Sequence, residues 1–124
     1  MDDILKKIRK YVDPHFSINR ALDFGCGVGR LLIPLSVYSS HVTGVDVSES
    51  MLDEARKNCE ARQITNVDFI KSDDDLSLLN RKFNFIHSYI VFQHIPAKRG
   101  VQIFKKMLAH LKNEGVGVLH FTYL

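Results

Sequence analysis

The chain has 124 residues, which is enough for one domain with a hydrophobic core. Its composition is ordinary for a globular protein, and its net charge of +3 is too small to indicate nucleic-acid binding. No apolar run reaches the roughly 18 residues of a membrane span, and the charged start over residues 1–7 lacks a signal-peptide pattern. The two cysteines fit neither a metal site nor a disulfide framework, so we expect a reducing, cytoplasmic setting.

Helical and strand-like patterns alternate along the whole chain. An amphipathic helix is expected over residues 2–12, before Pro14, either packed against a sheet or placed as a lid over a ligand cleft. The next elements are strands at 20–24, 41–46, 66–70, 83–89 and 116–124, helices at 30–38, 49–62 and 97–112, and a helical turn at 76–79. We therefore predict a single domain over residues 1–124, in which residues 1–19 form a leading helix and linker.

This alternation predicts an α/β domain, a Rossmann-like three-layer sandwich with a parallel sheet in the order 3-2-1-4-5. Its ligand should lie beyond the carboxyl ends of strands 1 and 4, where the strand order reverses. Ser48 is the expected N-cap of the helix over 49–62, and Gly115 is expected to end the helix over 97–112. The side chains expected on one face of that last helix are Val101, Phe104, Leu108 and Leu111, with Ile103 and Met107 beside them.

The most informative segment is residues 21–30, which reads ALDFGCGVGR. A buried strand ends at Asp23, glycines follow at every second position, and an apolar helix comes next. Glycines there let a ligand approach the main chain, whose free N–H groups point at it. Asp46 ends the second strand and is suited to hold the two hydroxyls of a ribose. Together these features indicate a nucleoside-containing cofactor.

Two residues favour S-adenosylmethionine over a dinucleotide as that cofactor. Arg30 stands where the dinucleotide fingerprint has its third glycine, which allows close packing of helix and strand. Asp23 would repel a pyrophosphate by several kcal/mol, as an order of magnitude, whereas it would attract the cationic sulfonium and ammonium groups.

Four segments then resemble the motifs of the Rossmann-like, class I S-adenosylmethionine-dependent methyltransferases of the small-molecule type, in the family's order. These segments are residues 22–30, 42–52, 67–73 and 83–96. The resemblance runs from about residue 20 to the end of the chain and implies the fold, the cofactor and the activity of that family. Two departures, Asn84 in the fourth strand and the turn at 112–116, are expected to lie away from the cofactor.

The predicted cofactor-binding residues follow the carboxyl ends of the strands. They are Asp23, Gly25, Cys26, Gly27, Gly29, Asp46, Val47, Met51, Asp73, Asp74 and Ser88. Asp23 would face the methionine ammonium, Cys26 would contribute only its backbone, and Asp73 matches the family residue that meets the adenine amino group. The alternatives are a ligand-free turn for the glycines, a helix cap for Asp46 and a solvated acidic loop at residues 73–75. Asp23 could instead cap neighbouring N–H groups, and Met51 could be a core residue facing the sheet.

The substrate side is expected near Tyr89 and His94, after the fourth strand. The Asn/Asp-Pro-Pro-aromatic signature of enzymes that methylate nucleic-acid bases is absent there, and the local pattern resembles members acting on small molecules. We interpret His94 as a positioning or cofactor-contacting residue, with a general base as the alternative. The remaining histidines form no constellation in the sequence, the catalytic residues stay unassigned, and no metal site is expected.

The predicted function is therefore methyl transfer from S-adenosylmethionine to a small-molecule acceptor, or the cofactor-binding core of such an enzyme. The alternatives are a non-catalytic S-adenosylmethionine-binding or interaction module and, less favoured, an NAD-dependent oxidoreductase. The sequence stops at 124 without the family's usual C-terminal strands, so we expect part of a longer enzyme. The alternative is a complete chain that covers the edge of its fifth strand by forming a homodimer.

Overall fold

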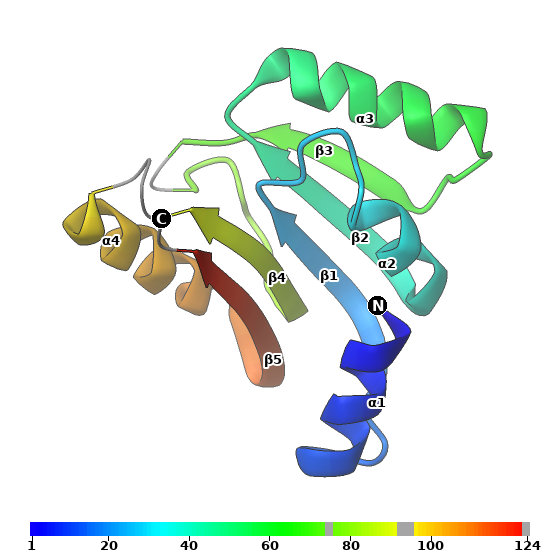
Figure 1. Ribbon diagram of the computed structural model, residues 1–124, viewed down its shortest axis with the longest axis vertical. Coiled ribbons are helices and arrows are strands. Elements are labelled where there is room, and N and C mark those ends of the chain that lie inside the picture. The colour runs from blue at the N-terminus through cyan, green and yellow to red at the C-terminus, as the bar shows by residue number, and fades with distance from the viewer. Residues whose placement is uncertain (74–75, 92–95, 123–124) are drawn as a thin grey trace.

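A five-stranded parallel sheet forms the centre of the protein in the computed structural model, which describes residues 1–73, 76–91 and 96–122. The strand order is β3-β2-β1-β4-β5, which confirms the predicted topology. In chain order the elements are α1 (Asp2–Tyr11), β1 (Ile18–Phe24), α2 (Leu32–Tyr38), β2 (Ser39–Asp46), α3 (Glu49–Ala61), β3 (Val67–Lys71), β4 (Phe83–Val91), α4 (Ala97–Ala109) and β5 (Leu111–Thr122). Figure 1 shows the five strand arrows pointing toward the same edge of the sheet.

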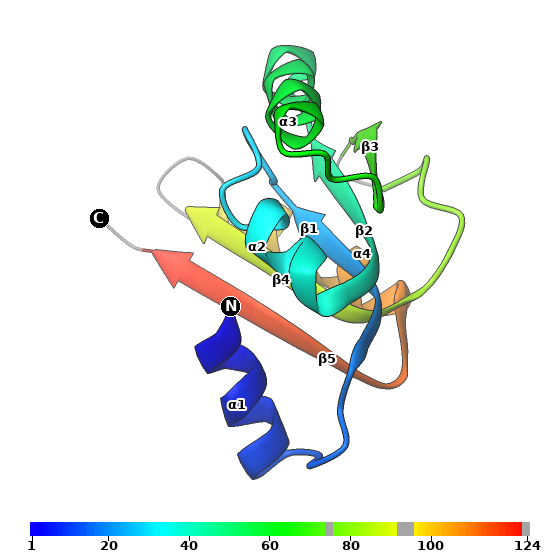
Figure 2. The same ribbon diagram turned by 90° about the vertical axis from the view of Figure 1, so that its right-hand side faces the viewer.

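Helices cover both faces of this sheet, so the domain has three layers. Figure 2 shows α2 in front of the sheet and α4 behind it. One hydrophobic cluster joins α1, α2 and α3 to the first face through buried side chains such as Leu5, Leu32 and Leu52. The second cluster joins α4 to the other face through Ile103 and Met107. Neighbouring residues of a central strand enter opposite clusters, as Ala21 and Leu22 of β1 and Phe85 and Ile86 of β4 do, because side chains alternate along a strand.

The leading helix α1 is part of the first cluster. Leu5 and Ile8 are buried there beside Phe16 and Ile18, so an apolar stripe of α1 is removed from water. This agrees with the packed alternative for α1, and none of its residues lines the cavity described below.

The end of α4 differs from the prediction. The helix stops at Ala109 and β5 begins at Leu111, so Gly115 lies inside the strand and does not end the helix. Leu111 continues the helical spacing of Leu108, yet it packs against the second cluster as the first residue of the strand. A single apolar residue fits either pattern, which explains the wrong boundary.

The buried face of α4 is also rotated from the expected one. Ile103 and Met107 are buried, whereas Val101 and Leu108 are about half exposed, at 50% and 49%. The apolar residues of α4 extend around more than one face, so their spacing alone did not identify the stripe that contacts the sheet.

Asn84, the departure from the family pattern in β4, ties the starts of two strands together. Its side-chain oxygen accepts hydrogen bonds from the backbone N–H groups of Asn19 and Arg20, and its amide donates to the carbonyl of Ser17. These bonds lie at the end of β4 opposite its carboxyl end. β5 forms one edge of the described sheet, and a homodimer through that edge stays a prediction.

Candidate cofactor site

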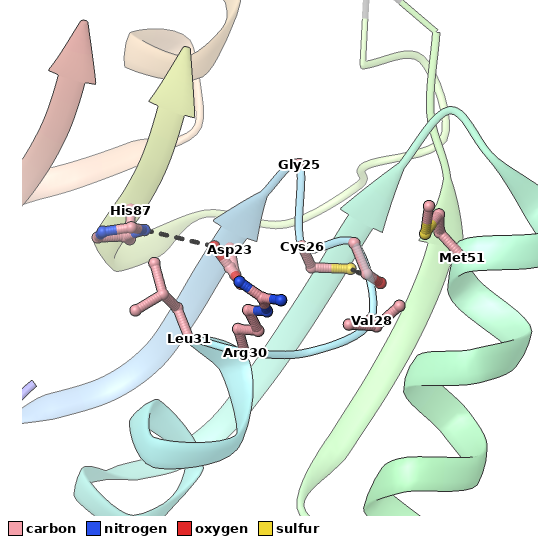
Figure 3. Close-up of a pocket in the computed structure, with 9 residues that line it drawn as sticks. Asp23, Gly25, Cys26, Val28, Arg30, Leu31, Met51 and His87 are labelled. Atoms are coloured by element: carbon pink, nitrogen blue, oxygen red, sulfur yellow. Dashed lines mark hydrogen bonds and ion pairs between the residues drawn. The ribbon is translucent and has the colours of Figure 1, made fainter. Parts of the chain in front are cut away.

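The candidate site lies where the strand order reverses, at the carboxyl ends of β1 and β4. A cavity of about 420 Å³ opens there, within the size range of small-molecule and cofactor sites. Its lining residues, most of them labelled in Figure 3, are Asp23, Gly25, Cys26, Gly27, Val28, Arg30, Leu31, Met51 and His87. Five of them belong to the predicted cofactor set.

The glycine loop leaves bare backbone on this cavity. Gly25, Gly27 and Gly29 have φ angles of +76°, +53° and +98°, a region that residues with a Cβ rarely adopt. A Cβ atom built on Gly25 or Gly27 meets nothing within 4 Å, so both positions border open space. A Cβ on Gly29 would instead contact Ile33 and Ala55. Gly29 therefore lies between α2 and α3, outside the cavity lining, and its role as a cofactor contact stays a prediction.

Asp46 holds this loop against the end of β2. One carboxylate oxygen accepts the N–H of Gly27 at 2.9 Å, and the other accepts the N–H of Ser48 at 2.9 Å. The N–H groups of Gly25 and Cys26 both donate to the carbonyl of Val45, at 2.7 and 3.0 Å. Asp46 is not among the cavity-lining residues, although each of its oxygens keeps lone pairs for further donors. Its contact with a ribose stays a prediction.

The start of α3 lies beside the loop. Ser48 is its N-cap, as predicted, and the Ser48 hydroxyl accepts the N–H of Met51 at 3.3 Å. Met51 is 44% exposed and lines the cavity, so it does not belong to the buried face of α3. Val47 is largely exposed on the preceding turn, and its contact with the cofactor stays a prediction.

The most buried polar groups of the cavity wall are Asp23 and His87. Asp23 in β1 and His87 in β4 are direct neighbours across the sheet, and Nδ1 of the ring is 3.4 Å from Oδ1 of the carboxylate. Burial raises the pKa of the Asp23 carboxyl group above its ordinary value, and the hydrogen bond with His87 offsets only part of that rise. The sequence pattern did not reveal this pair, because it depends on the register of two strands more than 60 residues apart.

The thiol of Cys26 is buried behind the loop. Burial and, to a smaller extent, the charges of Asp23 and Asp46 raise the pKa of the Cys26 thiol to about 12. The sulfur therefore stays protonated at neutral pH and is a poor nucleophile. This state agrees with the expectation that Cys26 contributes its backbone to the site.

Two further predicted residues, Ser88 and Asp73, are not among the residues that line the cavity. Ser88 is fully buried and follows His87 in β4, so it points to the α4 face; its hydroxyl finds no partner among the described residues. The Asp73 carboxylate accepts hydrogen bonds from the backbone and the hydroxyl of Ser77. Only the backbone of Tyr89 is described, paired with His120 of β5. The predictions for Asp74 and His94 lie outside the described residues.

Four lining residues were not predicted as cofactor contacts. Val28, Arg30 and Leu31 continue the glycine loop, and the length of that loop before α2 was the signal that could have included them. No local feature of the sequence marked His87 as a residue of the site. Within residues 1–73, 76–91 and 96–122, no group of three or more His, Cys, Asp or Glu side chains converges as a metal site.

The family model described as a methyltransferase domain matches residues 21–115 of this chain. Ubiquinone biosynthesis O-methyltransferase from Coxiella burnetii is 32% identical over 92 residues, which cover 70% of this chain and 38% of that protein. An uncharacterized protein from Rickettsia prowazekii is 31% identical over 114 residues, which cover 90% of this chain and 21% of that protein.

Solved structures of methyltransferases are also similar to this chain. An S-adenosylmethionine-dependent methyltransferase from Clostridium acetobutylicum superposes with a TM-score of 0.81 at 27% identity, covering 95% of this chain and 47% of that one. An amino pentose methyltransferase from Micromonospora echinaspora, solved with S-adenosylmethionine bound, superposes with a TM-score of 0.79 at 25% identity. The match covers 99% of this chain and 50% of that one. The chain thus spans about half of these structures and less of the curated relatives. By the match over residues 21–115, the chain belongs to the methyltransferase domain family.

Proposed function

We propose that this chain binds S-adenosylmethionine and forms the cofactor-binding part of a methyltransferase acting on a small-molecule acceptor. One observation carries the proposal. The buried carboxylate of Asp23 and the exposed backbone of Gly25 and Gly27 line the same cavity. A buried anion favours a cationic ligand, and glycine backbone favours a ligand that approaches the main chain closely.

The residues present fit this cofactor. Asp23 would face its ammonium group, and Gly25 and Gly27 would flank its methionine half. Asp46, which already accepts two backbone N–H groups, would accept from the ribose hydroxyls in a charge-assisted arrangement. The predicted adenine contacts are Val47, Met51, Asp73 and Asp74.

When bound, S-adenosylmethionine supplies a methyl group activated by a sulfonium, which an acceptor atom displaces in line. The protein's part is to align the acceptor with that carbon and to exclude water. Ser88, Tyr89 and His94 are the residues proposed for that end of the cleft. A side-chain base is needed only where the acceptor must lose a proton, so the absence of an assigned base is compatible with catalysis.

A small-molecule acceptor is supported by the names of two relatives, one an O-methyltransferase of ubiquinone biosynthesis and one an amino pentose methyltransferase. A cytoplasmic setting is supported by the thiols of Cys26 and Cys59, which are free and buried. Among the described residues, no helix is both long and apolar enough to cross a membrane.

Calorimetric titration of the purified protein with S-adenosylmethionine and S-adenosylhomocysteine tests the cofactor, with NAD as the control. We expect the first two to bind and NAD to give no heat. Binding of NAD alone would overturn the proposal in favour of an oxidoreductase.

Methyl transfer is tested with a methyl-labelled cofactor and a filtered small-molecule extract. Label in a product of low mass supports methyltransferase activity. The control is Asp23→Asn, which removes the charge with little change of shape and should form no labelled product. Cofactor binding without transfer to any fraction would favour the non-catalytic module.

A further inference from the structure

The Asp23 carboxylate, which borders the cavity, also contacts the ring of His87. Asp23 and His87 are partners in the β1–β4 register, so both side chains project from the same face of the sheet. The side chains are 4% and 1% exposed, and Nδ1 lies 3.4 Å from Oδ1. Figure 3 shows the ring beside the carboxylate at the wall of the cavity, with its other nitrogen turned away from Asp23.

The protonation state of His87 decides how much negative charge Asp23 offers to a ligand. A neutral ring with its hydrogen on Nδ1 donates to Asp23 and leaves the carboxylate with its full charge. A protonated ring forms an ion pair with Asp23 and places a second cation at the same carboxylate. At low local dielectric, two cations competing for one carboxylate repel each other strongly.

We propose that His87 is a positioning residue for the amino-acid end of the cofactor: as the neutral Nδ1–H tautomer it fixes the Asp23 carboxylate and leaves its charge for the ammonium group. This inference rests on the proposed function and assigns a role to a residue that the glycine-loop motif does not contain. His87 is a positioning residue and not a catalytic one, because its ring is buried and its Nδ1 is directed at Asp23.

The role of His87 predicts a selective effect on ligands that carry the ammonium. S-adenosylhomocysteine has this group, whereas 5′-methylthioadenosine has the same adenosine and thioether without the amino-acid end. The ratio of the two affinities therefore reports the Asp23 subsite and cancels changes in the adenosine site or in the amount of folded protein.

The same ratio should depend on pH. The titratable and charged groups around the pair are His120 of β5, with its ring centroid 5.1 Å from that of His87, Asp46 at the end of β2, and Cys26 and Arg30 in the loop. Because burial raises the pKa of the Asp23 carboxyl group, a falling pH returns its proton and removes its negative charge. The loss of that charge weakens the binding of an ammonium, so the preference for S-adenosylhomocysteine should fall as the pH falls.

The experiment titrates the wild-type protein and the variants His87→Phe and His87→Asn with both ligands by calorimetry. His87→Phe keeps a buried ring without a donor, and His87→Asn restores a donor near the position of Nδ1. At pH 8 we expect His87→Phe to lose about tenfold in affinity for S-adenosylhomocysteine and about twofold or less for 5′-methylthioadenosine. His87→Asn should recover most of the loss, while the control His41→Asn should leave both affinities unchanged.

An affinity ratio that is unchanged in His87→Phe would overturn the inference, as would equal losses for both ligands. If His87→Phe does not fold, nitrogen NMR of the His87 ring in the wild-type protein decides the question: a hydrogen on Nδ1 alone is expected, and a ring with its hydrogen on Nε2 overturns the inference. Binding of neither ligand by the wild-type protein would instead refute the proposed function, and this inference with it.

Discussion

Two histidine–aspartate pairs lie on the same sheet, and they differ in burial more than in distance. The Asp23–His87 pair, at the carboxyl edge, is almost fully buried with a separation of 3.4 Å. The Asp68–His41 pair, between β3 and β2, is closer at 2.7 Å, yet its side chains are 46% and 29% exposed. The strand alternation places the pairs on opposite faces. The shorter contact is therefore not the one with the larger expected consequence.

The environments of the two aspartates explain this difference. Asp68 also accepts a hydrogen bond from the Thr43 hydroxyl at 2.7 Å, and water reaches the rest of its carboxylate. Asp23 has one side-chain partner, and its other side borders the cavity. A charge screened by water interacts weakly with its surroundings, whereas a buried charge acts strongly on any ligand beside it.

The largest expected effect comes from removing the charge of the buried pair. Asp23→Asn should weaken the binding of S-adenosylhomocysteine by about 1.5–3 kcal/mol, the usual worth of a hydrogen bond to a charged group. The matched variant Asp68→Asn should change the affinity by less than about 0.5 kcal/mol, because it alters the surface away from the cavity. Calorimetry at one pH measures both affinities, and equal losses in the two variants would show that burial does not distinguish the two aspartates.

A third carboxylate, that of Asp46, differs from both because its partners are backbone N–H groups. We expect Asp46→Ala to weaken cofactor binding by roughly 1–3 kcal/mol through loss of charge-assisted hydrogen bonds. It should also lower the free energy of unfolding, since the N–H groups of Gly27 and Ser48 both lose their acceptor. Calorimetry and urea unfolding measure the two effects, with Asp46→Asn as the control that keeps one oxygen. An unchanged affinity in Asp46→Ala would exclude Asp46 from the cofactor site.

The sequence identified one member of the buried pair and missed the other for a physical reason. Asp23 stands beside the glycines, so a local motif marks it. His87 lies on the neighbouring strand β4, and a register shift of one residue would have placed it on the opposite face. His41 and Asp68 were missed for the same reason, because their contact also depends on strand pairing. Strand order and most element boundaries followed from local patterns, whereas contacts between strands did not.

The stability of the protein should also respond to removal of the Asp23 charge. Burial raises the pKa of Asp23 in the folded protein, so the folded state binds this proton more tightly than the unfolded state does. The linked contribution therefore favours folding in acid and is lost as the pH rises through the folded pKa. At pH 7 the ionised form opposes folding, and Asp23→Asn should raise the free energy of unfolding.

Urea unfolding of the wild-type protein and Asp23→Asn at several pH values measures this difference. The gain in stability should shrink as the pH falls and Asp23 of the wild-type protein takes up its proton. A variant that is less stable than the wild type at pH 7 would show that the bond to His87 outweighs the cost of burial.

The smallest effect is expected at the exposed pair. A double-mutant cycle with His41→Ala and Asp68→Ala should give a coupling energy of no more than about 1 kcal/mol, as for other exposed ion pairs. The coupling should decrease in high salt, which screens charges that water can reach. A coupling well above this range would mean that the short distance of 2.7 Å matters more than exposure, and the contrast between the two pairs would fail.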